Sequence, residues 1–454
     1  MEKHYEIDMC SGSIPKKLLL FAIPLMCSSV LQLLFNAADI IVVGRFAGDN
    51  SLAAVGSNTA LINLLTNLFI GLSIGANVLA ARYYGANKMN ELSRTVHTSM
   101  AISLISGVFL TAVGVIFAKS LLELMQTPQN ILELAKVYLR IYFVGMPAIM
   151  IYNFGSALLR AAGDTKRPLY YLIIAGIVNV LLNLLFVIVL KMDVAGVALA
   201  TVISEFISAY LVVRCLMQEE GGIKLMLSEL KIDADKLKNI LKIGLPAGFQ
   251  GVLFSLSNVV IQSSVNLFGE TVVAGNSAAS NIEGFVYVSM NSFYQAAISF
   301  TSRNVGAGKY SRINKILIYS LICVIATGII LGWTAYIFGR QLLGIYSSGA
   351  EVIDAGMVRI SIVCVTYALC GMMDVMVGSL RGLGYSVMPM IVSLLGACGL
   401  RLVWIGTVFQ IDRFHTPVTI YLSYPVTWII TFSVHLICFF IVRRKYGTKD
   451  EILQ

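Results

Sequence analysis

Long apolar segments are the feature that most limits what this chain can fold into. A helix of about 20 apolar residues spans the roughly 30 Å hydrocarbon core of a bilayer. The chain is 57% hydrophobic and 13% charged, whereas a typical soluble protein carries about 25% charged residues. We therefore predict an all-α polytopic membrane protein with twelve transmembrane helices. The predicted spans cover residues 18–43, 53–81, 96–117, 131–155, 169–190, 195–217, 241–267, 272–301, 314–338, 353–379, 387–409 and 418–442.

The lysine and arginine residues predict how these spans are oriented. Twelve spans place both termini on the same side of the membrane. If that side is cytoplasmic, 24 of the 33 Lys and Arg residues lie in cytoplasmic segments and 5 lie in outer ones. Basic residues concentrate on the cytoplasmic side, so we predict cytoplasmic N- and C-termini in a bacterial cell membrane. Contact with anionic membrane lipid accounts for the net charge of +9, and we expect no nucleic-acid partner.

The two halves of the chain repeat each other at an offset of 221 residues. Arg82 recurs as Arg303 and Arg160 recurs as Arg381, each followed three residues later by a glycine. Each half holds six predicted spans, so both halves have the same membrane orientation and are related by a pseudo-twofold axis along the membrane normal. This predicts an N-terminal lobe (1–217), a cytoplasmic linker (218–239), a C-terminal lobe (240–445) and a cytoplasmic tail (446–454).

A single acidic residue, Asp39, lies within the first apolar span. Its insertion into hydrocarbon costs roughly 2.5–3.5 kcal/mol on insertion scales, so such a residue marks an ion or substrate pathway. Gln32 and Asn36 precede it at helical spacing and share its face. We predict that Asp39 couples an ion to transport and that Gln32 and Asn36 contact the substrate. Hydrogen bonding between helices is the alternative for the two amides.

Further polar residues of the first half are spaced to complete an ion site. Asn179 and Asn183 are one turn apart in the fifth span, and Thr201 and Glu205 are one turn apart in the sixth. Their oxygens suit a hard cation such as Na⁺, and the Asp39 carboxylate could carry a proton instead. We predict ion coupling by these residues, with packing as the alternative. No metal site is expected beyond a Na⁺ at Asp39.

The second half carries its own candidates for substrate binding. They are one amide, two acids and one tyrosine, and we assign the substrate role to Gln262, Glu283, Tyr287 and Asp374. Acids and aromatic faces both attract positive charge, which favours a lipophilic cation as the small-molecule substrate. The alternative is a buried hydrogen-bond network, or ion pairing of the acids with Arg359 or Arg401.

Motifs of enzymes and of ATP-driven pumps are missing from the sequence. There is no glycine-rich phosphate loop followed by Lys-Ser or Lys-Thr, no nucleophile elbow and no His-Glu-x-x-His. We therefore expect no enzymatic activity and no cofactor other than a coupling ion, H⁺ or Na⁺. The energy for transport would come from an ion gradient.

The residues around the first span resemble those of the multidrug and toxic compound extrusion (MATE) family. Pro24, Asp39, Gly44 and the segment 52–56 carry this resemblance, as does the segment Leu-Arg-Ala-Ala-Gly-Asp-Thr-Lys at 159–166. It implies two six-helix lobes around a central cleft and efflux of drugs or toxic cations coupled to H⁺ or Na⁺.

The chain is similar to the branch of DNA-damage-inducible protein F (DinF-like) within that family. By position, Asp39, Asn179 and Thr201 match the coupling site of that branch. Asn183 departs from it, because many members have Asp there. Glu283 and Asp374 resemble acids that other branches use.

Two other functions remain open from the sequence. A lipid-linked oligosaccharide flippase of the same superfamily commonly has 14 spans and basic cavities, whereas this chain has 12 predicted spans and acidic candidates. A non-transporting membrane scaffold or receptor would not need acids inside the membrane. We expect a monomer.

Overall fold

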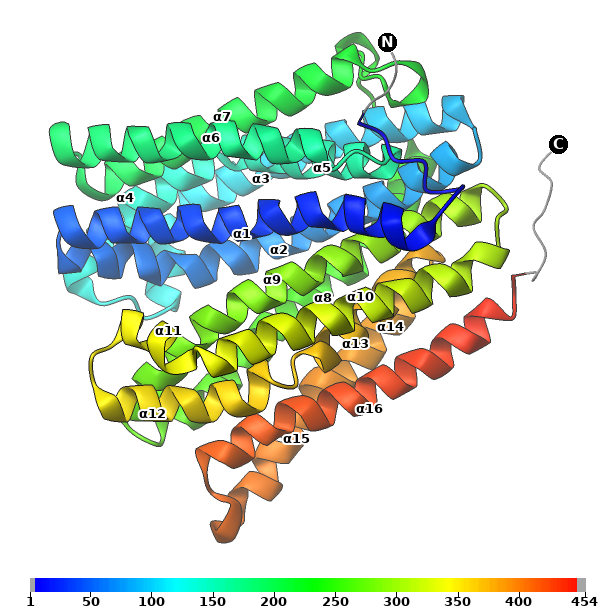
Figure 1. Ribbon diagram of the computed structural model, residues 1–454. Helices are drawn as coiled ribbons and strands as arrows, with labels where there is room; N and C mark the ends of the chain where they lie inside the picture. The colour runs from blue at the N-terminus through cyan, green and yellow to red at the C-terminus, as the bar shows by residue number, and fades with distance from the viewer. Residues whose placement is uncertain (1–4, 447–454) are drawn as a thin grey trace. The chain divides into compact units, whose positions relative to one another are not determined.

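The computed structural model describes residues 5–446, and within this range the chain is helical and contains no strand (Figure 1). Contacts divide it into two compact units. Unit 1 holds residues 5–7 and 27–248, and unit 2 holds residues 8–26 and 249–446. The predicted tail lies outside the described residues, apart from Tyr446.

Unit 1 is a bundle of long helices. Its core helix is α5, which packs against α2, α3 and α7. The fully buried Phe154, Leu158 and Leu159 of α5 lie within this core. Unit 1 comprises the later part of α1 (Ile14–Phe46), α2 (Asp49–Gly85), α3 (Met89–Leu124), α4 (Gln129–Val144), α5 (Met146–Ala162), α6 (Lys166–Asn183), α7 (Asp193–Gln218) and the beginning of α8 (Ala234–Asn266).

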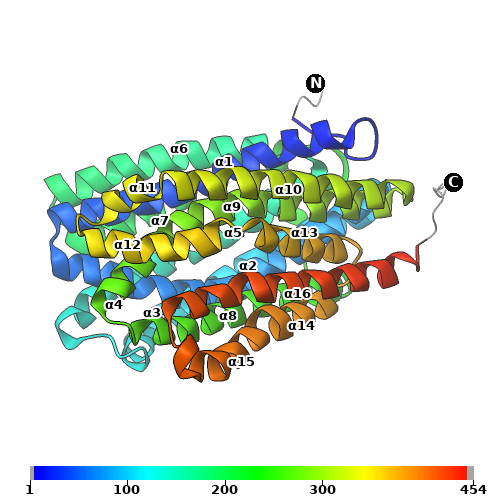
Figure 2. The ribbon, with the colours of Figure 1, turned by 60° about the horizontal axis from the view of Figure 1, so that its bottom comes forward.

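Unit 2 is also a bundle of helices, and α9 is central to it. In this unit α9 packs against α10, α12 and α13, and α16 runs beside α14 and α15 (Figure 2). Unit 2 comprises the beginning of α1, the rest of α8, α9 (Glu270–Gly306), α10 (Ser311–Ile337), α11 (Gly339–Tyr346), α12 (Ala350–Arg359), α13 (Ala368–Gly382), α14 (Val387–Ser393), α15 (Leu400–Gly406) and α16 (Pro417–Arg443).

Two predicted spans are bent rather than straight. The predicted span 131–155 consists of α4 and α5, which meet at Gly145 with a bend of 46°. The predicted span 353–379 likewise bends by 43° between 364 and 368. At the first break, Pro147 stands in the first turn of α5, where its missing N–H costs no helical hydrogen bond.

Eleven of the twelve predicted spans are long and apolar enough to cross a membrane. Within residues 5–446, nine helices meet this requirement singly, and the two bent pairs bring the number to eleven. The remaining predicted span, 272–301, lies in α9. This helix has 37 residues but carries many polar side chains along its length, among them Asn276 and Glu283. Its polarity reflects the buried polar contacts described below.

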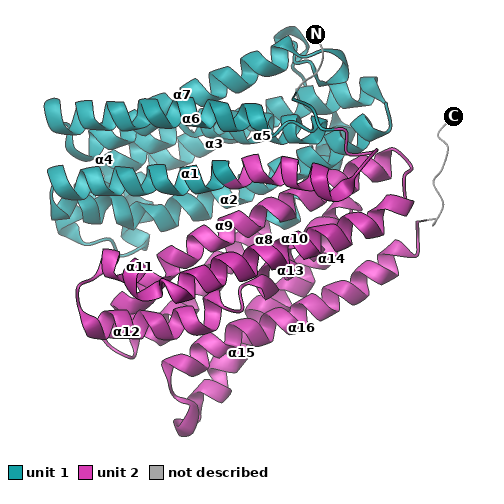
Figure 3. Ribbon diagram, viewed as in Figure 1, with its two compact units in different colours: residues 1–7, 27–248 teal, residues 8–26, 249–454 magenta. Residues whose placement is uncertain are grey.

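The boundaries between the compact units fall inside helices α1 and α8, not at the predicted lobe boundaries (Figure 3). In unit 1, α8 crosses α2 at glycines: a Cβ added to Gly71 would lie 2.3 Å from the backbone nitrogen of Gly248. Only glycine permits this backbone approach. In unit 2, Phe21 of α1 packs edge-on against Phe300 of α9, with ring centroids 5.5 Å apart. The beginning of α1 therefore belongs to unit 2, and the beginning of α8 belongs to unit 1.

Three short π-helical segments interrupt the helices next to buried polar residues. They are Leu184–Val189 after Asn183, Ile360–Cys364 after Arg359, and Leu394–Gly399 shortly before Arg401. A π-helical turn adds a residue to the helix and redirects the side chains beside it, and such turns are frequent at functional sites.

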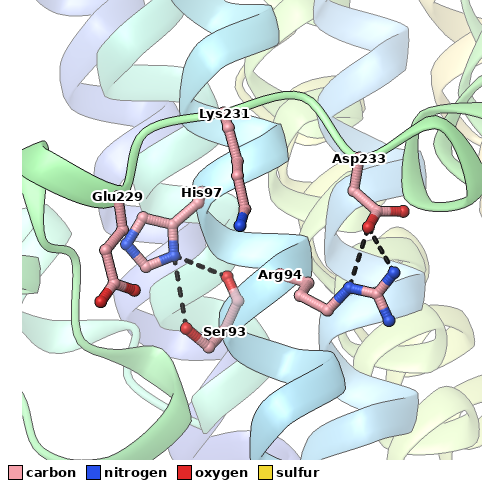
Figure 4. A pocket seen from close by; sticks show the side chains of 6 residues that line it. All are labelled: Ser93, Arg94, His97, Glu229, Lys231 and Asp233. Atoms are coloured by element: carbon pink, nitrogen blue, oxygen red, sulfur yellow. Dashed lines mark hydrogen bonds and ion pairs between the residues drawn. The ribbon is translucent and has the colours of Figure 1, made fainter.

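The linker is shorter than predicted and is held by α3. It covers residues 219–233, because α8 begins at Ala234, and it contains two short 3₁₀ turns. The backbone N–H of Met226 donates to Nε2 of His97 at 3.1 Å, and Arg94 pairs with Asp233 at 2.5 Å. Figure 4 shows the small surface pocket that results, lined by Ser93, Arg94, His97, Glu229, Lys231 and Asp233.

The charged groups of this pocket hold the linker rather than a ligand. The backbone N–H of Lys236 and the guanidinium of Arg94 both donate to Asp233, and they lower the pKa of that carboxylate. A lowered pKa means that the contact contributes to stability at neutral pH and loses that contribution as the pH falls. We therefore regard this pocket as a structural feature of unit 1.

Candidate functional site

Asp39 receives two hydrogen bonds from other helices of unit 1. The amide of Asn183, at the end of α6, donates to Asp39 Oδ1, and the hydroxyl of Thr201, on α7, lies 3.4 Å from Asp39 Oδ2. Thr201 lies closer to the carbonyl oxygen of Val197, at 3.0 Å, so its hydroxyl is shared between two acceptors. Asn183 is consequently the stronger partner of the carboxylate.

The two asparagines of α6 connect this contact into a network. Asn183 Nδ2 lies 3.1 Å from Asn179 Oδ1, and Asn179 Nδ2 lies 3.4 Å from Thr201 Oγ1. Both asparagines are buried, with exposed fractions of 5% for Asn179 and 1% for Asn183. Residues predicted from helical spacing on three separate spans therefore meet in one place.

The Asp39 cluster, defined as Asp39, Asn179, Asn183 and Thr201, has an uncompensated negative charge. In the described part of the chain, no lysine or arginine pairs with Asp39. The side-chain oxygen of Asn183 is buried and has no hydrogen-bond donor. A carboxylate beside a free amide oxygen is a donor set that suits Na⁺, and the carboxylate alone suits a proton.

Glu205 does not join this cluster. It lies one turn after Thr201 on α7, and its carboxylate accepts a long hydrogen bond of 3.5 Å from Ser208 on its own helix. Between residues 5 and 446, no hydrogen bond connects Glu205 to Asp39 or to the asparagines of α6. Helical spacing placed Thr201 and Glu205 on one face, but the packing of α7 directs only Thr201 to the carboxylate.

Two tyrosines near Asp39 were not predicted from the sequence. Tyr138 and Tyr142 of α4 stack with centroids 5.9 Å apart, and α4 packs against α7, which carries Thr201 and Glu205. Tyr138 and Tyr142 are one helical turn apart in the sequence, and this spacing could have indicated that they share a face of the helix. Gln32 and Asn36, in contrast, are exposed on α1 and have no hydrogen-bond partner among residues 5–446.

We expect Asn183→Leu to raise the ion concentration needed for half-maximal transport by about tenfold or more. The substitution removes the amide donor to Asp39 and the free amide oxygen, and a hydrogen bond to a charged group contributes about 1.5–3 kcal/mol. The measurement is efflux rate against ion concentration in proteoliposomes.

Asn153→Leu is the matched control for this substitution. Asn153 is an amide of the same unit that donates only to the carbonyl of Ile149 on its own helix. An unchanged ion dependence in Asn183→Leu, together with a changed drug affinity, would place Asn183 in the drug site instead.

In unit 2, Glu283 is ion-paired, as the alternative interpretation of the sequence foresaw. Arg359 donates from Nε and Nη2 to the two carboxylate oxygens at 2.7 and 2.8 Å. Its Nη1 donates to Asn276 Oδ1 at 2.6 Å. The Glu283 side chain is 4% exposed and its charge is neutralised, so it does not offer a free carboxylate to a cationic substrate in this structure.

Gln262 belongs to the same network. The amide of Asn276 donates to Gln262 Oε1 at 2.9 Å, and Gln262 in turn donates to Asn266 at 2.9 Å. The hydroxyl of Tyr421 also donates to Asn276 at 3.2 Å. These contacts join α8, α9, α12 and α16, so the network holds four helices of unit 2 together.

Asp374, on α13, is a further acid of unit 2. No hydrogen bond or ion pair reaches its carboxylate from residues 5–446. Asp374 lies on α13, which packs against α9, and α9 carries Tyr287. Tyr287 is 38% exposed, and its ring packs against that of Tyr367 with centroids 6.5 Å apart. Asp374 and Tyr287 therefore provide an acid and an accessible aromatic face in one region.

Known proteins match this chain along most of its length. The MatE family model matches two segments, residues 24–185 and 246–405, which begin at Pro24 and at Pro246. The chain belongs to the MatE family. It is 28% identical over 396 residues to the probable multidrug resistance protein YoeA of Bacillus subtilis, and this match covers 86% of each chain.

Solved structures of MATE transporters have the same fold. A MOP superfamily transporter from Pyrococcus furiosus superposes with a TM-score of 0.90, at 22% identity over 96% of this chain and 98% of that one. A MATE transporter in an outward-facing conformation superposes with a TM-score of 0.87 and the same identity and coverage. The predicted MATE resemblance and the all-helical transporter fold are thus confirmed.

MatE membership decides the class of this protein. It is a multi-pass membrane transporter of small molecules and not an enzyme. The two matched segments correspond to the two halves of the predicted repeat. The assignment to the DinF-like branch, the coupling ion and the roles of individual residues stay predictions.

Proposed function

We propose that this MatE protein is a secondary active efflux transporter that exports drugs or toxic organic cations in exchange for H⁺ or Na⁺. The observation that carries the proposal is the Asp39 cluster. It combines a carboxylate without a cationic partner, a buried oxygen of Asn183 without a donor, and a position inside a long apolar helix. A bound cation would neutralise the carboxylate and interact with the free oxygen of Asn183, so this site suits cation uptake.

Cationic substrates fit the second unpaired carboxylate. Asp374 and the partly exposed ring of Tyr287 both attract positive charge. We assign the substrate to this region of unit 2. The substrate role of the exposed Gln32 and Asn36 of α1 stays a prediction from the sequence. In this proposal Glu283 and Gln262 support the site and do not contact the substrate, because they already form hydrogen bonds with Arg359 and Asn276.

The remaining features of the proposal follow from the sequence. The predicted excess of Lys and Arg places both termini in the cytoplasm of a bacterial cell, with membrane lipid as the surrounding partner. The two six-helix lobes would alternate in access to the substrate, and the protein would act as a monomer. An oligosaccharide flippase is disfavoured because such flippases commonly have 14 spans and basic cavities, whereas this chain has 12 predicted spans and acids within them.

Ion-driven flux in proteoliposomes tests this function. Moving one charge through 100 mV contributes about 2.3 kcal/mol, but one-for-one exchange of a monovalent cation moves no net charge. We therefore expect that collapsing the voltage at a fixed ion gradient leaves efflux of a cationic dye largely intact, and that collapsing the ion gradient stops it.

Two outcomes would contradict this scheme in different ways. Efflux that follows the voltage alone would exclude one-for-one exchange of a cation. Efflux that requires ATP and needs no ion gradient would exclude the antiporter itself.

A further inference from the structure

The middle of the linker is held on α3 by the side chain of His97, which is 3% exposed. The backbone N–H of Met226 donates to Nε2 of this ring at 3.1 Å. On the other side of the ring, Nδ1 donates to the carbonyl oxygen of Ser93 at 2.7 Å, and it also contacts the hydroxyl of Ser93 (Figure 4). Both ring nitrogens of His97 are therefore in use.

These two contacts fix the protonation state of the His97 ring. A carbonyl oxygen can only accept a hydrogen bond, so Nδ1 carries the proton. A backbone N–H can only donate, so Nε2 carries none. The contact with Met226 exists only while His97 is neutral, because a proton on Nε2 would place two N–H groups face to face. Its contribution to stability is therefore present at high pH and is lost as the pH falls.

The charged groups beside the His97 ring come from α3 and from the linker. Arg94, Glu229, Lys231 and Asp233 line the pocket next to it (Figure 4). They are two bases and two acids, and Arg94 already pairs with Asp233. Glu229 and Lys231 are exposed and opposite in sign, and exposed charges interact with a neighbour by at most about 1 kcal/mol. The hydrogen bonds of the ring therefore decide which form binds the linker.

The other elements that pack against α3 place no charge in this pocket. The ends of α2 and α5 carry Arg82 and Arg160, and neither residue lines it. Lys236 of α8 pairs with Glu91 of α3 and donates to the hydroxyl of Tyr83. The 3₁₀ turn at the start of the linker has no charged side chain, and α4 packs against the opposite half of α3. His97 is thus the group of this region that can change its charge near neutral pH.

A second attachment of the linker does not depend on this proton. The backbone N–H of Asp233 donates to the hydroxyl of Thr98 at 3.0 Å, and Arg94 pairs with the Asp233 carboxylate. Hydrogen bonds from the backbone of Lys236 and from Arg94 hold the pKa of this carboxylate below its ordinary value. Asp233 therefore stays charged where histidine titrates. Loss of the Met226 contact would free the middle of the linker and leave its end at α8 in place.

We propose that the linker contains a pH-sensitive switch, the His97 switch, in which neutral His97 holds residues 224–230 on α3 and protonated His97 releases them. Histidine changes charge between pH 5 and 8, so the switch responds to acidification on the side of the membrane where the linker lies. The sequence predicts that this side is the cytoplasm. Release would lengthen the free chain between α7 and α8. The switch goes beyond the proposed export function and does not depend on which ion drives it.

Hydrogen exchange of the purified full-length protein, followed by mass spectrometry, tests the switch. The protection of the amides of residues 224–230 is compared at about pH 8 and about pH 5.5, after correction for the intrinsic effect of pH on exchange. An imidazole in water titrates near pH 6.5, so a released one is about tenfold more often charged than neutral at about pH 5.5. We expect the protection of this segment to fall by about fivefold to tenfold, while the core of α5 keeps its protection.

Three variants connect this response to the His97 ring. His97→Gln keeps an acceptor for the N–H of Met226 and takes up no proton, so protection should be high at both pH values. His97→Leu removes the acceptor and should give low protection at both. His415→Gln is the matched control. It changes an exposed histidine of unit 2 whose Nδ1 donates to the carbonyl oxygen of Phe409, and it should keep the pH response of the wild-type protein.

Three results would overturn the switch. They are a wild-type protection of residues 224–230 that does not change with pH, a fall in His97→Gln equal to that in the wild type, and an equal fall in the core of α5, which would indicate general acid unfolding. The wild-type comparison needs no variant, so it decides the question even if a variant does not fold. Failure of the proposed function looks different, because it would appear as loss of ion-driven efflux and not in the exchange of the linker.

Discussion

Asp39→Asn is expected to lower ion-driven efflux by at least about a hundredfold while the protein still inserts and folds. The substitution keeps the size of the side chain and a polar contact with Asn183, but it removes the charge that takes up and releases the coupling ion. A site without that charge cannot bind H⁺, and it binds Na⁺ only through neutral oxygens. Efflux driven by an imposed ion gradient in proteoliposomes measures the loss.

Asp412→Asn is the matched control for Asp39→Asn. Asp412 is an exposed acid of a short turn, Asp412–Phe414, outside the apolar helices. Its substitution should leave efflux unchanged. Wild-type rates in Asp39→Asn would show that the coupling ion binds elsewhere, and the proposal for the Asp39 cluster would then be wrong.

Arg359→Met is expected to lower the free energy of unfolding by about 3–5 kcal/mol. Removal of one partner leaves the buried Glu283 carboxylate without its counter-charge, and breaking a buried ion pair in this way is strongly destabilising. The loss also frees Asn276, which connects α9 with α12 and α16. Thermal unfolding in detergent, read as a drop in the melting temperature, measures the effect.

The double variant Arg359→Met with Glu283→Met controls this prediction. It removes both charges together, so most of the stability should return, because replacing a buried ion pair by apolar side chains is often neutral. If the double variant is as unstable as Arg359→Met alone, the hydrogen bonds to Asn276 rather than the ion pair hold the helices of unit 2.

The two units therefore use buried polar groups in different ways. In unit 1, the Asp39 cluster has a free charge and a free oxygen, which suits a ligand that binds and leaves. In unit 2, the pair of Arg359 and Glu283 is neutral and saturated, which suits a fixed structural role. Asp374, Arg381 and Arg401 lie within helices of that unit and have no ion-pair partner among the described residues.

Hydrophobic patterning made much of this architecture predictable. A membrane span must satisfy its own backbone hydrogen bonds, so a long apolar segment can only be a helix. The repeat at 221 residues and the family match at 24–185 and 246–405 reflect the same duplication. The acid inside the first span identified Asp39 without a structure, because no soluble or lipid-facing role explains a carboxylate at that depth.

Helical spacing predicted which residues share a face. This prediction succeeded where all residues of the face contact the same neighbour. Asn179 and Asn183 are one turn apart, and both lie in the Asp39 cluster. The same reasoning joined Glu205 to Thr201, but within residues 5–446 Glu205 makes no hydrogen bond to the Asp39 cluster. A face of a helix is wide enough to contact two different neighbours, so spacing alone cannot choose between them.

Only the tertiary structure decided which charges are paired. Glu283 and Arg359 are 76 residues apart, and the sequence contains equally plausible partners at Arg401 and Asp374. The bend at Gly145 and the glycine crossing of α2 with α8 also depend on contacts between distant segments. The amino-acid sequence by itself determined the class of protein and the position of its principal acid, because both follow from the local cost of placing residues in hydrocarbon. Pairing and unit boundaries required the fold, because they depend on which helices pack together.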